Sequence, residues 1–548
     1  MDNTILRGVT LPNPTFRVEE LSTSLQSMKH YSNLQSTIPP MKQIFNIKNQ
    51  SNILFDNEYT INTIQFTEDN SIKGNCKLTT LHKDKLINID SYLKVTHLLD
   101  PVYFIQNKYS EEKIKKKLDD PWNQAYVETV ASYVLGKLKE QDVSLHFNLF
   151  YGAYTSVADK YSYNISDEVE SYRMYRWFWD GIESERMKIE IEGDDEVVKA
   201  ELLSEIMVKP EFCIESKSDS DTDDMIEELK GVDISSSNSD LESLDSASLS
   251  TISESSEVSS TDSDECDVFL TVNKFPVMMI FTEKNTSTMD DLLEDFEEVG
   301  AEPETEGWED RWSAWVFQII AALTVVQTLF KFTHNDLHTN NIVWTETEEE
   351  FLYYTTLNNK FNTASNNKVY KVPTYGKIFK IIDFGRSIFS LNEHLFISDD
   401  FYEGNDADTQ YNFPPLSDNS EEPTVYPNFS FDLTRLSISL IEGLFPETPR
   451  ERLNAKILSK ESGRVVKETI SDLYNILWHW LIDDKGENIL YDENNDERFP
   501  DFQLYVHISA HCRNAIPKEQ LNHKLFQKYI IKNILTLPKD IKIYSLYV

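Results

Sequence analysis

Two polar motifs joined to strand-forming segments constrain this chain more than any other feature of its sequence. The first, His334–Asn341, reads HNDLHTNN: an Asp follows the His by two residues, and an Asn follows that Asp by five. The second, Asp383–Gly385, reads DFG and ends an apolar run. A lone DFG triplet has little meaning, but three polar positions fixed in this order are hard to obtain by chance.

Each motif borders a predicted β-strand. Asn341–Trp344 leaves the first motif and Lys377–Ile382 enters the second, so a β-hairpin built from them would bring Asn341 and Asp383 to one point. Amide and carboxylate oxygens suit Mg²⁺. Asp336 would accept or orient the proton of an attacking hydroxyl. Phosphoryl transfer needs this set, since the protein must position a hydroxyl, hold magnesium and neutralise phosphate charge.

The two motifs resemble those of the protein-kinase superfamily. Their amino-acid sequence is most similar to the corresponding motifs in the Ser/Thr protein kinases of large nucleocytoplasmic DNA viruses. The resemblance covers about Trp308 to Gly385 and the surroundings of Asp432. It implies an α+β, two-lobed protein-kinase-like fold, with a small antiparallel β lobe carrying one helix and a larger, mainly helical lobe. It also implies a viral enzyme that uses ATP and Mg²⁺ to phosphorylate protein hydroxyls.

The resemblance further implies a strand Lys that holds the α- and β-phosphates and a helix Glu that orients it. Lys94 lies within the predicted strand Ser91–Leu98, and Glu128 is the sole acidic residue of the predicted helix Pro121–Lys139. We assign both to the catalytic site, the alternative being an exposed Lys and a solvent-facing Glu. The resemblance also implies that Asp432 braces the backbone of the first motif, whereas a helix-capping Asp fits the sequence equally well.

Three more residues are assigned to nucleotide binding. Gly74 is the only glycine in Asp69–Asn75, where the family's glycine-rich loop should cover the phosphates. With so few glycines the backbone approaches phosphate less easily, so a catalytically weak pseudokinase scaffold stays open as an alternative. Glu283 and Asn285 fall in the hinge predicted after the strand Val272–Phe281.

Three departures from the family pattern bear on mechanism. Asn335 stands where an Arg commonly precedes the catalytic Asp, so we expect no switching by a phosphorylated activation loop. His338 replaces a Lys that neutralises the γ-phosphate, and we assign it to the catalytic set although a His is charged only part of the time near pH 7. No Ala-Pro-Glu follows the second motif, and Tyr411–Pro415 and Tyr426–Pro427 are the nearest substitutes. His338 and the missing triplet keep a small-molecule phosphotransferase open as an alternative.

Composition excludes several classes of protein. The chain has 548 residues, 40% of them apolar, which is enough for two lobes and a sizeable core. Its net charge of −41 argues against direct nucleic-acid binding, because phosphate backbones are held by Lys and Arg. Four widely spaced cysteines favour a reducing compartment and neither a disulfide framework nor a zinc site. We expect a cytoplasmic protein, in the host cytoplasm or the virion if viral, without a signal peptide.

One segment, Ser313–Phe332, is apolar enough to raise the question of a membrane span. It contains polar residues such as Gln318 and Thr324, and it ends two residues before His334. We therefore expect a buried helix that leads into the first motif, and no membrane span.

Composition and periodicity divide the chain into five parts. They are a polar N-terminal extension (1–50), the first part of the β lobe (51–157), an acidic Ser-rich insertion (158–267), the end of the β lobe with the hinge (268–290), and the helical lobe (291–548) with a hairpin insertion (345–367). Further strands are predicted at Tyr59–Phe66, Lys77–Leu81, Leu86–Ile89 and Leu145–Tyr154. Further helices are predicted at Arg311–Phe332, Asp432–Gly443, Val465–Ile482 and Leu525–Ile534.

The acidic insertion is the most unusual of these parts. Its segment Glu211–Asp267 holds 18 acidic residues against two Lys, which predicts disorder because too little apolar surface is present to offset chain entropy. Two roles are open for it. It is either a solvated spacer or, since serines such as Ser237 often have an acidic residue three positions on, a phosphorylated segment that docks a partner.

Overall fold

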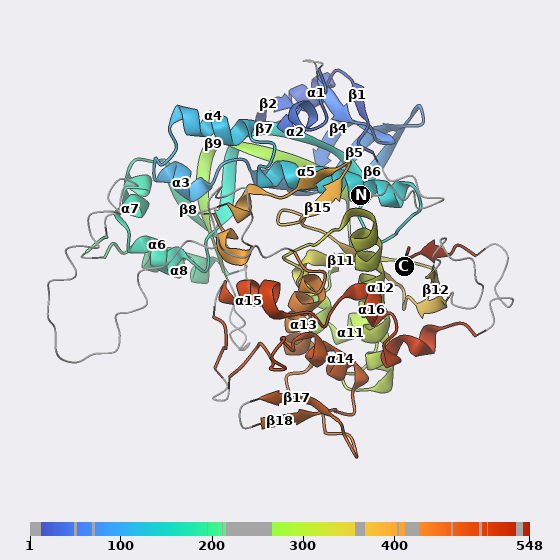
Figure 1. Ribbon diagram of the computed structural model, residues 1–548. Helices are drawn as coiled ribbons and strands as arrows, with labels where there is room; N and C mark the ends of the chain where they lie inside the picture. The colour runs from blue at the N-terminus through green and yellow to red at the C-terminus, as the bar shows by residue number, and fades with distance from the viewer. Residues whose placement is uncertain are drawn as a thin grey trace, which may run out of the picture.

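The computed structural model is an α+β protein, as the sequence predicts. A large antiparallel sheet and helix α5 fill the upper part of Figure 1, and helices α12, α13, α14 and α15 fill the lower part. The structure describes residues 13–48, 52–67, 72–193, 195–210, 212–214, 266–356, 368–402, 405–411, 427–461, 464–492, 496–500, 502–532 and 541–547.

The large sheet has the strand order β2-β7-β9-β6-β5-β4, with β8 paired to β9, and each pair is antiparallel. The strands are β2 (Tyr31–Gln35), β4 (Tyr59–Phe66), β5 (Gly74–His82), β6 (Lys85–His97), β7 (Phe150–Asn164), β8 (Met187–Glu192) and β9 (Asp267–Glu283). β4 coincides with its prediction. The two strands predicted on either side of Asp90 form the single strand β6, because pairing with β5 continues through that residue.

Helix α5 (Gln124–Glu140) packs against the large sheet and is buried along most of its length. Asn123 caps its N-terminus, accepting a hydrogen bond from the Ala125 N–H at 3.1 Å. A Cβ at Gly136 would lie 3.0 Å from the backbone nitrogen of Phe150, so this glycine allows the helix to approach β7 closely. The helix therefore holds its buried side chains, including Glu128, at a fixed position beside the sheet.

Two boundaries expected from composition differ from the structure. Strands β1 (Phe16–Val18) and β2 lie within the predicted polar extension, where β1 pairs with β3 (Ile53–Phe55) and β2 pairs with β7. The predicted insertion start at residue 158 falls inside β7, because buried side chains such as Ala158 and Tyr161 continue the packed face of that strand.

Beyond β7 the chain forms three further helices at the left of Figure 1. They are α6 (Val169–Arg173), α7 (Arg176–Glu183) and α8 (Glu196–Ile206), with β8 between α7 and α8. The predicted disordered segment Glu211–Asp267 lies outside the described residues except for residues 212–214 and 266–267.

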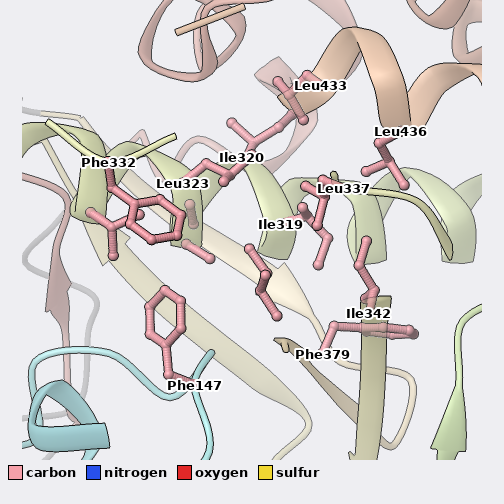
Figure 2. Packing of buried hydrophobic residues seen from close by; sticks show 14 of the residues in the cluster. Phe147, Ile319, Ile320, Leu323, Phe332, Leu337, Ile342, Phe379, Leu433 and Leu436 are labelled. Atoms are coloured by element: carbon pink, nitrogen blue, oxygen red, sulfur yellow. The ribbon is translucent and has the colours of Figure 1, made fainter. Parts of the chain in front are cut away.

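Helix α12 (Glu306–Phe330) is the central helix of the lower part. In the described part of the chain it is the one helix long and apolar enough to cross a membrane, and 94% of its most apolar window is buried inside the protein. It is thus a core helix, as the sequence predicts for this segment. Figure 2 shows Ile319 and Ile320 of α12 close to Leu337 of the first motif, with Leu436 of α13 (Phe431–Leu444) nearby. The first motif is therefore anchored by an apolar side chain in the core.

Three predictions for the C-terminal half need correction. Val465 and Val466 belong to β18 (Arg464–Lys467), paired with β17 (Ile457–Glu461), and the helix α14 (Asp472–Trp480) begins only at Asp472. The predicted helix at Leu525 is the 3₁₀ helix Lys524–Tyr529. The predicted loop-rich insertion 345–367 contains β12 (Phe351–Thr355), which pairs with β13 (Val369–Pro373) and, in parallel, with β19 (Tyr544–Ser545); residues 357–367 lie outside the described part.

Candidate functional site

A three-stranded sheet positions the two polar motifs. It consists of β10 (Ser287–Thr288), β11 (Ile342–Glu346) and β14 (Lys377–Ile381), and β11 pairs with both neighbours. Ile342 lies opposite Ile381, and the Ile382 N–H donates to the Asn341 carbonyl at 3.0 Å. Asn341 and Asp383 therefore leave the sheet at the same end, as the predicted hairpin requires.

Lys94 contacts two carboxylates at once. Its Nζ lies 2.6 Å from Glu128 Oε1 and 2.8 Å from Asp383 Oδ1. Burial alone would lower the pKa of Lys94, but the two carboxylates outweigh it and raise the pKa. The strand Lys, the helix Glu and the DFG Asp thus form one cluster, and the alternative of an exposed Lys with a solvent-facing Glu is ruled out.

The members of this cluster differ in exposure. The Glu128 side chain is only 5% exposed, whereas those of Lys94 and Asp383 are 33% and 44% exposed. Burial raises the pKa of Glu128 to about 7, although the Lys94 ammonium opposes that shift. The ammonium and the Asp383 carboxylate therefore remain accessible to a ligand, while Glu128 serves as their buried support.

Asp336 is held by two partners from distant parts of the chain. The Tyr505 hydroxyl donates to Asp336 Oδ1 at 2.8 Å, and Arg386 Nη1 lies 3.8 Å from Asp336 Oδ2. Burial would raise the pKa of Asp336, but the charges of Arg386, His338 and Arg435 and the Tyr505 hydrogen bond together outweigh burial and bring the pKa down to about 2. Asp336 is thus an anion at neutral pH, ready to accept a hydrogen bond from a hydroxyl group.

Asp432 braces the backbone of the first motif. Its carboxylate, which is fully buried, accepts hydrogen bonds at 3.0 Å from the backbone N–H groups of His334 and Asn335. No helix-capping hydrogen bond is made by the residue at the N-cap of α13, Ser430. Of the two roles open from the sequence, bracing the motif is the one the structure contains.

His334 joins the two motifs. Its Nε2 donates to the Ile382 carbonyl at 2.8 Å, one residue before Asp383. Asn335 and Asp383 both adopt left-handed backbone conformations, with φ of 66° and 62°. Such conformations are unfavourable for residues with a Cβ and cluster at functional sites, where the surrounding contacts hold them in place.

Asn335 ties the first motif to the segment after the second. It is buried, its Nδ2 donates to the Arg386 carbonyl at 2.9 Å, and its Oδ1 accepts from the Tyr411 hydroxyl at 2.7 Å. A neutral side chain thus occupies the position where the resemblance would place an Arg.

Asn341 is oriented by two neighbours. Its Nδ2 donates to the Asp336 carbonyl at 2.9 Å and lies 3.0 Å from His338 Nε2, which accepts from it. With the amide nitrogen used in this way, the amide oxygen is the atom left for a cation. This donor chemistry, together with the accessible Asp383 carboxylate, fits Mg²⁺, which prefers oxygen ligands.

The residues assigned to nucleotide binding lie in different surroundings. Gly74, with φ of 91°, pairs with Leu93 and so stands beside Lys94, while residues 69–71 of the predicted loop lie outside the described part. The Glu283 carboxylate is bound by Lys139 at 2.5 and 2.7 Å and by Lys380 at 3.0 Å.

Asn285 belongs to the same ion cluster, since its Oδ1 lies 3.3 Å from Lys380 Nζ. Burial opposes ionisation of Glu283, but the two ammonium groups lower its pKa. The Glu283 and Asn285 side chains thus connect the end of β9 to α5 and β14, and do not contact the Lys94 cluster.

Sequence reasoning missed three residues of the site, namely Arg386, Asp399 and Tyr505. Asp399 accepts from the Gln124 N–H at 2.9 Å at the start of α5 and forms an ion pair with Lys117. Tyr505 is 169 positions from Asp336 in the sequence. No local pattern signals such contacts, because they arise only when distant segments pack together.

Neither the protein-family models nor the curated proteins searched contain a match to this chain. Among the described residues, no group of three or more His, Cys, Asp or Glu side chains is arranged to hold a metal ion by itself. A cation bound by Asp383 and Asn341 would take its remaining ligands from water or from a bound molecule.

Proposed function

We propose that this chain is an ATP- and Mg²⁺-dependent Ser/Thr protein kinase with a two-lobed, protein-kinase-like fold. The observation that carries the proposal is the position of Lys94 Nζ, 2.6 Å from Glu128 and 2.8 Å from Asp383. Holding one ammonium between a buried helix carboxylate and an accessible carboxylate costs desolvation. That cost is understandable if the ammonium binds phosphate and the accessible carboxylate binds the accompanying cation.

The arrangement of the elements supports the fold assignment. The antiparallel sheet with α5 would be the smaller lobe, and the part built around α12 would be the helical lobe (Figure 1). Glu283–Asn285 connects β9 to β10 and would be the hinge. The Lys94 cluster joins β6 and α5 of the first lobe to Asp383 of the second, where a nucleotide between two lobes would be bound.

Each residue of the site would have a separate role in phosphoryl transfer. Lys94 would neutralise phosphate charge, and Asp383 and Asn341 would hold Mg²⁺, which when bound withdraws charge from phosphate oxygens. Asp336 would accept a hydrogen bond from the acceptor hydroxyl and orient it, which its low pKa allows at neutral pH. His338 acts through Asn341, whose amide it orients.

The proposal includes the source suggested by the motifs. Resemblance to Ser/Thr kinases of large nucleocytoplasmic DNA viruses supports a viral enzyme that acts in the infected-cell cytoplasm or in the virion. Its substrates would be protein hydroxyls, and the acidic insertion would be the segment to delete, over residues 216–265, when partner docking is tested.

Transfer of labelled phosphate from ATP tests the function. The wild type should label basic or acidic protein substrates. Asp336→Ala should lower the rate of labelling by at least about 100-fold. The control Asp180→Ala, a change at an exposed position on α7, should leave the rate unchanged. ATP binding without transfer to any acceptor would favour a scaffold. Labelling of small hydroxyl compounds alone would replace the protein-kinase proposal with a small-molecule phosphotransferase.

A further inference from the structure

The Tyr505 hydroxyl is hydrogen-bonded on both sides. Arg435 Nε lies 2.9 Å from it, and Asp336 Oδ1 lies 2.8 Å away. An Arg side chain can only donate hydrogen bonds, so the hydroxyl oxygen accepts from Arg435. The single hydroxyl proton is then donated to Asp336. The two hydrogen bonds therefore run in one direction, from Arg435 to Tyr505 and from Tyr505 to Asp336.

Packing leaves the Tyr505 ring little freedom. The residue is 1% exposed and lies on α15 (Gln503–His511). Its ring stacks on Phe502 with centroids 5.2 Å apart and contacts Phe431 at 5.8 Å. The hydroxyl is therefore held at a defined point in the core, and the Asp336 oxygen that it contacts is held with it.

The two oxygens of Asp336 have different surroundings. Oδ1 receives the Tyr505 proton at 2.8 Å, while Oδ2 has the Arg386 guanidinium at the longer distance of 3.8 Å. The Asp336 side chain is 25% exposed. The carboxylate thus has one tightly bound oxygen and one loosely contacted oxygen, which is the arrangement needed to present a single oxygen to an acceptor hydroxyl.

We propose that Tyr505 is a positioning residue: its hydroxyl fixes the rotation of the Asp336 carboxylate so that Oδ2 faces the acceptor hydroxyl. This inference rests on the proposed phosphotransferase function and adds a residue from outside both motifs to it. Tyr505 acts through Asp336, and it contacts neither the Lys94 cluster nor Asn341 by any hydrogen bond found among the described residues.

The test is Tyr505→Phe, which keeps the ring and removes the hydroxyl. We expect kcat for phosphoryl transfer to fall about 10- to 100-fold, since misplacing a reacting group has effects of this size. ATP affinity, measured by direct binding, should stay within about twofold. The matched control is Tyr529→Phe, because the buried Tyr529 hydroxyl has no hydrogen-bond partner among the residues that the structure describes and lies on the 3₁₀ helix Lys524–Tyr529.

A double-mutant cycle separates positioning from general support of the fold. In an Asp336→Ala background the acceptor of the Tyr505 hydroxyl is absent, so Tyr505→Phe should produce no further loss of residual transfer. An equal loss in both backgrounds would show a structural role and overturn the proposal, as would a single variant with wild-type kcat. A wild type that binds ATP but transfers no phosphate would instead remove the proposed function, and the inference with it.

Discussion

The Tyr411 hydroxyl donates a hydrogen bond to Asn335 Oδ1 at 2.7 Å, and both side chains are buried. Asn335 also donates to the Arg386 carbonyl. The first motif is thus connected to the segment after the DFG triplet by hydrogen bonds between uncharged groups. Such bonds form without an added phosphate, so an enzyme built in this way would be active without phosphorylation of that segment.

Replacing Asn335 by Arg should therefore damage the protein, although it introduces the residue that the family pattern would favour. An unpaired charge would enter a fully buried position, at a cost of about 3–5 kcal/mol in the free energy of unfolding. Urea denaturation measures this loss. In a parallel experiment, phosphatase treatment of the wild type should leave transfer unchanged, and a large loss would contradict the neutral connection.

Replacing Lys94 by Met should remove phosphate neutralisation and lower kcat by at least about 100-fold. The variant also leaves Glu128 buried without its cation, so a stability loss of a few kcal/mol should accompany it. Lys85→Met, on the exposed start of the same strand, is the matched control. Transfer rates and thermal unfolding of the two variants should differ clearly; equal rates would show that Lys94 has no catalytic role.

Asp399 should control the position of α5. Asp399→Asn keeps an acceptor for the Gln124 N–H but loses the ion pair with Lys117, whereas Asp399→Ala loses both. We expect kcat to decrease in the order wild type, Asn, Ala, with about tenfold loss for Ala, because α5 carries Glu128. An Ala variant with full activity would show that the helix is held by its core contacts alone.

Asp432→Asn should destabilise the first motif. Asp432 Oδ1 accepts from the N–H groups of both His334 and Asn335, and Oδ2 accepts from that of His334. An amide therefore loses one acceptor and sets an NH2 donor against the buried His334 N–H. Such a loss costs about 1–3 kcal/mol. Chemical denaturation measures it, and a variant with wild-type stability would show that the two N–H groups are satisfied in another way.

Stability should depend on pH through His146, which lies beneath β14. Its ring bonds to the Phe379 carbonyl at 2.7 Å and to the Tyr354 hydroxyl at 2.8 Å, and burial lowers its pKa from 6.5 to about 4. The unfolded chain therefore binds a proton that the folded chain does not. The contribution of neutral His146 to stability is complete above pH 6.5 and is lost as the pH falls toward 4.

Comparing wild type with His146→Phe isolates this effect. The difference in unfolding free energy between them should shrink by about 1.4 kcal/mol for each pH unit below 6.5. Urea unfolding at pH 7.5, 6.5 and 5.5 gives the slope. A difference that stays constant over this range would contradict the buried neutral state of His146.

The sequence was informative where a site depends on neighbours in the chain. Asn341 and Asp383 meet because each ends a strand of one local pairing, and the spacing of the motifs contains that information. Lys94 and Glu128 could be chosen because each stands out from its own element, one in an apolar strand and one in an apolar helix. The sequence did not allow us to choose Arg386, Asp399 and Tyr505, because packing between distant segments determines which residues they contact.

The errors in the fold have the same origin. Val465 and Val466 continue an apolar pattern that also fits a helix, and only their pairing with β17 selects a strand. At Asp90 the sequence shows a break that the pairing with β5 overrides. The local preference of a segment for helix or strand predicts its structure poorly when hydrogen bonds to a neighbouring strand outweigh that preference.

The length of β7 and β9 determines where the chain can be shortened. Both strands extend from the edge of the site to helices α6, α7 and α8, so residues 158–164 and 267–274 are about half of each of the two most extensively paired strands in the sheet. A deletion that removed all of 158–267 would cut β7 in the middle, remove β8 and leave the first half of β9 without its pairing partners. A variant made for crystallisation should instead begin its deletion after Ile214 and end it before Cys266, which keeps every ladder of the large sheet intact.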